Sequence, residues 1–218
     1  MQYQTLALAV ATLILSVTTA PNPTVTNAQN VELAACANTL PKSSGTSVLK
    51  AAQTIAAGEP FDGGMKMFDR GASCAGKAEG GYSDAVFQTA AGGSLSNVII
   101  GPNQIEGVHC QGACALTNMW WSAVCEDAFS IKKQSSSQTT YVKGGGAFGA
   151  DDKVVQHNDA GTVSISDCVV EEFSKLYRSC GNCDSMYERH VIMDGITATS
   201  GSELAGRSLN FRPSPKQS

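Results

Sequence analysis

Acidic and then basic side chains recur at intervals of about 20 to 25 residues in the middle of this 218-residue chain. In chain order they are Glu106, Glu126, Asp127, Asp151, Asp152, Lys153, Lys175 and Arg178. If a repeating backbone stacks these positions, the carboxylates lie about 5 Å apart and repel one another unless a cation lies between them. Ligands that are all oxygen select a hard ion, and Ca²⁺ tolerates irregular carboxylate geometry better than Mg²⁺ does. The basic end would suit an anionic substrate, and a solvated charged face is the alternative interpretation.

The backbone that could stack these residues is predicted from short apolar runs rich in Val, Ile, Thr and aromatic residues, with Gly or Asn at their ends. Equivalent positions recur after 21 or 22 residues: Leu95 and Asn97 as Leu116 and Asn118, Lys153-Val154-Val155 as Lys175-Leu176-Tyr177, and Tyr141-Val142 as Val163-Ser164. This repeat favours an all-β fold of stacked coils, the parallel β-helix, over a β-sandwich. Asn97 and Asn118 would form an internal ladder, and Gly144–Gly146 a tight coil corner. A short helix is expected over residues 47–57.

The composition is that of a single globular domain with a weakly acidic balance. Lys and Arg number 15 against 19 Asp and Glu, for a net charge of −4, which disfavours a nucleic-acid-binding protein. Residues 6–17 form an apolar run too short to span a bilayer and typical of a secretory signal. We therefore divide the chain into a signal peptide (1–20, with cleavage as late as residue 28), a leader rich in Pro, Ser and Thr (21–45), a β-helix domain (46–206) and an atypical polar tail (207–218).

Eight cysteines follow the predicted signal: Cys36, Cys74, Cys110, Cys114, Cys125, Cys168, Cys180 and Cys183. An even number in an exported chain predicts disulfides, although the pairing stays open. Zinc is the alternative, since the Cys110/Cys114 and Cys180/Cys183 spacings resemble ligand pairs and His109 and His190 lie near them.

Four ordered segments carry a resemblance to a known family: GVHCQGACALTNMWWSAVCEDAFSIK, GGGAFGADDKVVQHNDAGTV, FSKLYRSCGNC and RHVIMDGIT. Over about residues 60–206 the chain resembles the pectate lyases of polysaccharide lyase family 3, in their fungal and oomycete branch. The resemblance implies a right-handed parallel β-helix and a secreted, Ca²⁺-dependent enzyme. Such an enzyme cleaves de-esterified homogalacturonan by β-elimination to 4,5-unsaturated oligogalacturonates. The family's calcium ligands fall on Glu106, Glu126, Asp127 and Asp152, and its basic residues on Lys153, Lys175 and Arg178.

The reaction removes the C5 proton of a galacturonate unit and expels the C4 oxygen. A lysine loses its own proton more readily than an arginine, so we favour Lys153 as the base and Lys175 as the alternate. Arg178 suits a bidentate grip on the C6 carboxylate. His109 and His157 are expected to be structural or substrate-lining, and of the consecutive Trp120 and Trp121 one should face outward. The chain is expected to be a monomer.

Two other functions compete with the lyase interpretation. A secreted, non-catalytic pectin-binding relative is one, because the polar tail departs from the family's usual continuation. The other is a β-helix hydrolase of the polygalacturonase type, which would use Asp151 and Asp152 as an acid and base pair without Ca²⁺.

Overall fold

The computed structural model describes residues 39–74 and 80–206, all within one compact unit. The predicted signal peptide, most of the leader with Cys36, and the predicted tail lie outside the described residues. The 3₁₀ turn η1 (Tyr82–Asp84) accompanies thirteen strands, and the described residues include no helix long and apolar enough to cross a membrane. The strands are β1 (Thr46–Val48), β2 (Gln53–Ile55), β3 (Pro60–Asp69), β4 (Ala85–Thr89), β5 (Ser94–Ile100), β6 (Glu106–Cys110), β7 (Ala115–Trp121), β8 (Asp127–Ile131), β9 (Thr139–His157), β10 (Gly161–Ser166), β11 (Val169–Ser179), β12 (Arg189–Asp194) and β13 (Thr197–Gly206).

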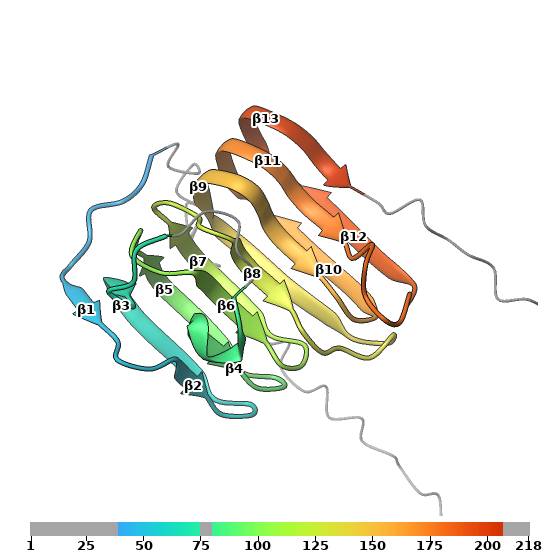
Figure 1. Cartoon of the computed structure of the whole chain (residues 1–218), viewed down its shortest axis with the longest axis horizontal. Coiled ribbons are helices and arrows are strands. Elements are labelled where there is room, and N and C mark those ends of the chain that lie inside the picture. The colour runs from blue at the N-terminus through green and yellow to red at the C-terminus, as the bar shows by residue number, and fades with distance from the viewer. Residues whose placement is uncertain (1–38, 75–79, 207–218) are drawn as a thin grey trace, which may run out of the picture. The chain divides into compact units, whose positions relative to one another are not determined.

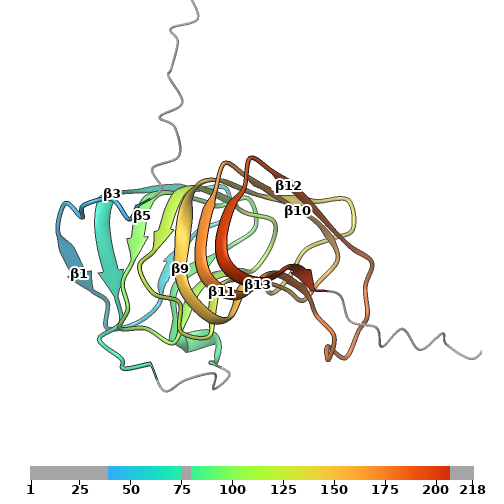
Figure 2. The ribbon, with the colours of Figure 1, turned by 90° about the horizontal axis from the view of Figure 1, so that it is seen from above.

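The strands are parallel and stack coil upon coil. On one side β1, β3, β5, β7 and the first half of β9 pair in turn, and on another β2, β4, β6, β8 and the second half of β9 do the same. Figure 1 shows the coils side by side from β1 in blue to β13 in red, and Figure 2 shows the chain winding round at each coil. The predicted parallel β-helix is confirmed. The β-sandwich alternative is wrong, because every strand pairing among the described residues is parallel, whereas a sandwich is built from antiparallel strands.

The coils turn at equivalent residues. Asn97 (φ 53°), Asn118 (φ 52°) and Gly144 (φ 68°) occupy matching positions of β5, β7 and β9, and all adopt the left-handed conformation that Gly and Asn tolerate best. Asn118 Nδ2 donates to Asn97 Oδ1 at 2.8 Å. The predicted asparagine ladder and glycine corner are thus present, although the asparagines are half-buried at a corner and not inside the coil.

The interior is filled by columns of apolar side chains. Phe87, Val108, Phe129, Val155 and Tyr177 stand in register on β4, β6, β8, β9 and β11, and all are buried. Burying a large apolar side chain is worth about 1.5–3 kcal/mol. One such side chain in every coil explains why a repeat of 20-odd residues is visible in the sequence.

Two local predictions are wrong. Residues 47–57 form β1 and β2 instead of a helix, because parallel pairing with β3 and β4 satisfies their backbone groups. Tyr141 pairs with Ser164 and not with Val163, so this coil is one residue longer than the spacing suggested. Only the structure shows how much chain each coil uses at its turns.

Three disulfides join described cysteines: Cys74–Cys125, Cys110–Cys114 and Cys180–Cys183. Cys168 is buried, and its Sγ lies 3.3 Å from Ser166 O. The zinc alternative is therefore wrong, since both cysteine pairs that suggested it are oxidised to disulfides and offer no thiolate.

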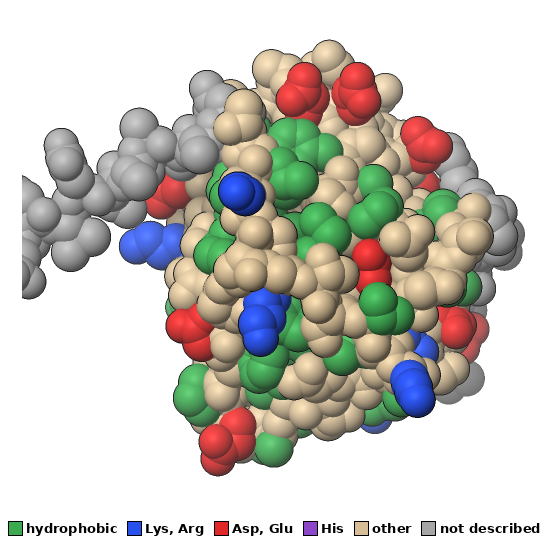
Figure 3. Space-filling view, turned by 90° about the vertical axis from the view of Figure 1, so that its left-hand side faces the viewer, with side chains coloured by type: hydrophobic (Ala, Val, Ile, Leu, Met, Phe, Trp, Pro, Cys, Tyr) green, Lys and Arg blue, Asp and Glu red, His purple; other side chains and the backbone are tan. Residues whose placement is uncertain are grey.

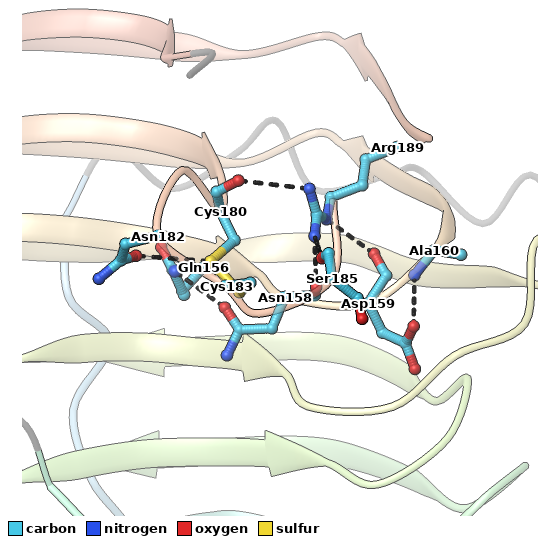
Figure 4. The surroundings of a disulfide bond; sticks show 9 residues. All are labelled: Gln156, Asn158, Asp159, Ala160, Cys180, Asn182, Cys183, Ser185 and Arg189. Carbon is cyan, nitrogen blue, oxygen red and sulfur yellow. Dashed lines mark hydrogen bonds between the residues drawn. A yellow bond between two sulfur atoms is a disulfide. The ribbon is translucent and has the colours of Figure 1, made fainter. Parts of the chain in front are cut away.

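The guanidinium of Arg189 hydrogen-bonds to backbone carbonyls around the Cys180–Cys183 disulfide. Arg189 donates to the carbonyl oxygens of Asn158 at 2.6 Å, Asp159 at 2.9 Å, and Cys180 and Ser185 at 3.3 Å (Figure 4). Burial lowers the pKa of this guanidinium from its usual value. The arrangement ties the loop between β11 and β12 to the end of β9, and it serves the fold.

Candidate functional site

One charged column runs along the stack formed by β6, β8, β9, β11 and β13. Asp127 pairs with Lys153, Lys153 with Lys175, and Lys175 with Glu203. Glu106 lies opposite Asp127, because it stands two residues before Val108 just as Asp127 stands two residues before Phe129, and Val108 pairs with Phe129. The change from acidic to basic along the chain is therefore a change along one line of neighbouring strands.

Three carboxylates meet at the acidic end of this column. Glu106 begins β6, Asp127 begins β8, and Glu126 directly precedes Asp127. One oxygen from each lies within 4.8 Å of the others, and the three residues are 0%, 2% and 1% exposed, respectively. We call these three residues the acidic triad. Gly80 packs against it, because a Cβ there would lie 2.5 Å from Glu106 Cγ.

Lys153 is the cation that this triad faces. Its Nζ lies 2.8 Å from Glu126 Oε1, 3.4 Å from Asp127 Oδ1 and 2.5 Å from Asp152 Oδ2. Lys153 is itself 2% exposed. Asp152 was expected beside the other carboxylates. It contacts Lys153, but its side chain is 22% exposed and it is outside the triad.

Crowding of the carboxylates changes their protonation. Burial, followed by the charges of Glu126 and Asp127, raises the pKa of Glu106 to about 9, although nearby Lys132 opposes the rise. Burial and the charge of Glu126 raise the pKa of Asp127 well above its usual value, while Lys153 opposes this. Without a metal ion between its carboxylates, the triad holds at least one proton at neutral pH.

The pKa of Lys153 is governed by two opposing influences. Burial by itself lowers this pKa, but the charges and hydrogen bonds of Asp127, Asp152 and Glu126 more than offset burial, so the pKa of Lys153 lies above its usual value. In this state the amine keeps its proton and serves as a counter-ion.

Several triad oxygens lack a hydrogen bond. Among the described residues, no hydrogen-bond partner reaches Glu106 Oε1 or Oε2, Glu126 Oε2, or Asp127 Oδ1. Buried polar atoms rarely remain without partners. Four oxygens without an aligned hydrogen bond on three converging carboxylates fit a hard divalent cation, which prefers oxygen ligands, although Asp127 Oδ1 is also within ion-pair distance of Lys153.

The basic end of the column is more open than the triad. The Lys175 side chain is 30% exposed, and its Nζ lies 3.9 Å from Glu203 Oε2 on the next coil. Arg178 is half-buried three residues further along β11. Asp152, Lys175 and Arg178 are thus the accessible members of the predicted site, while the triad and Lys153 lie beneath the surface.

A second polar column runs three residues further along the same strands, and the spacing of the charges did not single out its members Gln88, Ser130 and Gln156. In register it contains Gln88, His109, Ser130, Gln156 and Arg178. His109 Nε2 lies 3.2 Å from Glu106 Oε2, and burial, followed by the charge of Lys132, lowers the pKa of His109 to about 3. Gln88 stands 21 residues before His109, so the coil period could have identified it.

The two tryptophans do not offer an open ring. Trp121 belongs to the core and stacks on Phe129 with centroids 6.0 Å apart. Trp120 faces the other way, as predicted, but it is only 5% exposed and stacks on Phe148. His157 is also internal, because its Nε2 donates to Ala160 O and its Nδ1 accepts from Tyr177 Oη.

Comparison with known sequences points to one family. The family described as pectate lyase matches residues 37–215. The chain is 57% identical over 173 residues to a probable pectate lyase D of Emericella nidulans, and 57% identical over 172 residues to pectate lyase H of the same organism. Each match covers 79% of this chain and 65% of the relative, so the chain spans just under two thirds of the length of these relatives.

Solved structures share the fold. The catalytic domain of pectate lyase PelI from Erwinia chrysanthemi superposes with a TM-score of 0.54 at 21% identity, covering 78% of this chain and 80% of that domain. PelI in complex with tetragalacturonic acid superposes with a TM-score of 0.51 at 22% identity, over 84% of this chain and 59% of PelI. With the family match covering most of the chain and relatives more than half identical, the protein belongs to the pectate lyase family.

Proposed function

We propose that this chain is a secreted, Ca²⁺-dependent pectate lyase that cleaves de-esterified homogalacturonan by β-elimination. One observation carries the proposal. Two members of the buried acidic triad, Glu106 and Asp127, stand in the same column as two lysines, so the proposed cation site adjoins a basic site. A hydrolase of the polygalacturonase type would need a carboxylate pair as acid and base. Asp151 is exposed and Asp152 is engaged by Lys153, which does not support that pair.

Glu106, Glu126 and Asp127 would hold Ca²⁺, with Asp152 as the fourth expected ligand. Bound there, Ca²⁺ would neutralise the charge of the C6 carboxylate of a galacturonate unit and so make the C5 proton of that unit more acidic. The triad's contribution is to supply converging oxygens from two adjacent coils in a buried, preorganised position.

Lys153 is our proposed base, with Lys175 as the alternate. The carboxylates that contact Lys153 keep its pKa high in the metal-free state. When those carboxylates are engaged elsewhere, their negative charge no longer holds the proton on Nζ, and burial then lowers the pKa of the amine. The same three ion pairs keep Lys153 protonated in the metal-free protein. The pKa of Lys153 should therefore fall when a cation occupies the triad.

Arg178 and Lys175 would bind substrate carboxylates. Both are partly exposed on β11, one coil beyond Lys153, where a polyanion can reach them. The Arg178 guanidinium offers paired N–H donors that match a carboxylate. The relative solved with tetragalacturonic acid supports an oligogalacturonate as the substrate.

Secretion is supported by the apolar run at residues 6–17 and by three disulfides, which persist in oxidising compartments. We propose that the protein acts as a monomer with a polysaccharide as its partner. The end of the stack that carries β1 presents acidic and basic side chains dispersed among apolar ones (Figure 3), which does not suggest a nucleic-acid surface.

The test is near-ultraviolet absorbance of the unsaturated product during incubation with polygalacturonate at alkaline pH. We expect a rise with Ca²⁺, none after chelation with EDTA, and recovery when Ca²⁺ is restored. A Ca²⁺-independent gain in reducing ends without that absorbance would indicate hydrolysis. Binding to pectate with neither signal, by protein shown to be folded by circular dichroism, would indicate a non-catalytic relative.

A further inference from the structure

Two buried side chains behind the acidic triad have no assigned part in the proposed chemistry. His109 lies on β6 and Gln88 on β4, adjacent in register, and each is 1% exposed. Buried polar side chains are costly unless they are hydrogen-bonded. Their partners therefore indicate what this pair does.

A backbone carbonyl sets the orientation of Gln88. Tyr82 O can only accept a hydrogen bond, and it accepts from Gln88 Nε2. The same Nε2 lies 2.9 Å from His109 Nδ1, and Gln88 Oε1 accepts from Gln111 Nε2 at 2.9 Å. The Tyr82 contact fixes the orientation of the Gln88 amide, and the contacts with His109 and Gln111 are both compatible with it.

That orientation selects the tautomer of His109. The Gln88 amide nitrogen donates and cannot accept, so His109 Nδ1 must be the acceptor. A neutral imidazole then carries its only proton on Nε2. Nε2 lies 3.2 Å from Glu106 Oε2, three residues earlier on β6. The contact is not aligned as a hydrogen bond, so both Glu106 oxygens remain available to another partner.

We infer that Gln88 and His109 are positioning residues for Glu106. Gln88 holds His109 with its Nε2 proton toward the carboxylate. The close contact of Nε2 with Glu106 Oε2, at 3.2 Å and without an aligned hydrogen bond, then limits where the Glu106 carboxylate can lie and keeps it directed into the acidic triad. This inference rests on the proposed calcium site, for which it names the outer support. Removing an outer contact of a metal ligand commonly weakens metal affinity by about 10- to 100-fold.

Metal affinity, measured apart from lyase activity, tests the inference. Tb³⁺ is a suitable probe, because Trp121 lies against β6 beside Glu106: a Cβ at Gly107 would be 2.7 Å from Trp121 Nε1. Tryptophan-sensitised Tb³⁺ luminescence, displaced by Ca²⁺, gives affinities for both ions. The informative variants are His109→Leu, which removes the N–H, and His109→Gln, whose amide nitrogen can replace Nε2.

Gln88→Leu provides an independent variant that leaves the imidazole in place but frees its tautomer. His157→Leu and Gln134→Leu are matched controls, since each removes a buried, hydrogen-bonded side chain of the same type from outside the triad. Circular dichroism and thermal unfolding of every variant separate loss of affinity from loss of fold.

We expect His109→Leu and Gln88→Leu to weaken Ca²⁺ binding about tenfold or more, and His109→Gln and both controls to stay within about threefold of wild type. Wild-type affinity in both leucine variants, with affinity lost in Glu106→Gln, would overturn the inference and leave the proposed function standing. If Glu106→Gln binds as tightly as wild type, the calcium site and this inference are both wrong. Should His109→Leu not fold, Gln88→Leu decides the matter alone.

Discussion

Binding of Ca²⁺ to the acidic triad should release protons, and its affinity should rise with pH. A pKa of about 9 means that Glu106 is protonated in the metal-free protein at neutral pH, whereas a calcium ligand must be ionised. One proton is therefore displaced for each ion bound below about pH 9. Displacement of one proton makes the dissociation constant fall about tenfold per pH unit, or about 1.4 kcal/mol. Between about pH 6 and 8 the affinity should increase about 100-fold, and further if Asp127 also releases a proton.

The same shift determines how metal-free stability depends on pH. The proton on Glu106 is held more tightly in the folded state, at about 9, than at the usual value of 4.5. Its stabilisation is complete below about pH 4.5 and is lost progressively as the pH rises toward 9. The free energy of unfolding without metal should therefore decrease over this window, and added Ca²⁺ should restore it.

Calorimetric titration with Ca²⁺ in two buffers of different ionisation enthalpy measures the protons released. Glu106→Gln is the control, because it keeps the shape of the protonated carboxyl but has no proton to release. This variant should bind Ca²⁺ weakly, show a flatter pH dependence, and exceed wild type in metal-free stability at about pH 8. Wild-type binding without proton release and without pH dependence would refute the reasoning, since Glu106 would then be ionised before the metal arrives.

Three further predictions concern neighbouring features. Lys153→Met should lower the lyase rate by about 100-fold or more while Ca²⁺ affinity is kept or increased, because a competing cation is removed; near-normal kcat would exclude Lys153 as the base. Gly80→Ala should cost about 1–3 kcal/mol of stability and weaken Tb³⁺ binding, whereas Gly45→Ala, with nothing within 4 Å, should do neither; equal melting temperatures would contradict this. In urea unfolding, loss of Cys74–Cys125, 51 residues apart, should cost about 4 kcal/mol, against about 2 for Cys180–Cys183, 3 apart; equal costs would contradict the loop-closure argument.

The stack and the charged column could be predicted from sequence because both depend on one repeated spacing. Lys153 and Lys175 stand in register as their 22-residue interval indicates, and Leu95 and Leu116 do so at an interval of 21 residues. In a β-helix, residues one coil apart are neighbours, so a local pattern carries three-dimensional information. The resemblance to the family rests on the same segments and leads to the same fold.

What could not be predicted depends on how neighbouring coils and loops cover the column. The spacing indicates that Lys153 follows Asp127, but not that three carboxylates surround its ammonium or that two of them, Glu126 and Asp127, are buried with it. Trp120 has the predicted direction, yet only the packing of Phe148 shows that its ring is covered. The link from Gln88 to Glu106 depends on an amide orientation that the Tyr82 backbone carbonyl sets. Every residue type carries that carbonyl, so the identity of residue 82 gives no sign of the contact.

Pairing only between successive coils has a consequence for how the molecule opens. Among the described strands, β1, β2, β12 and β13 each have one paired neighbour, whereas β6 and β8 have neighbours on both sides. In such a linear array, stability is close to a sum of nearest-neighbour contributions, and fraying starts at the ends. We therefore expect amide hydrogens of β6 and β8 to exchange last, and the outer coils to open and close many times while the carboxylates remain assembled.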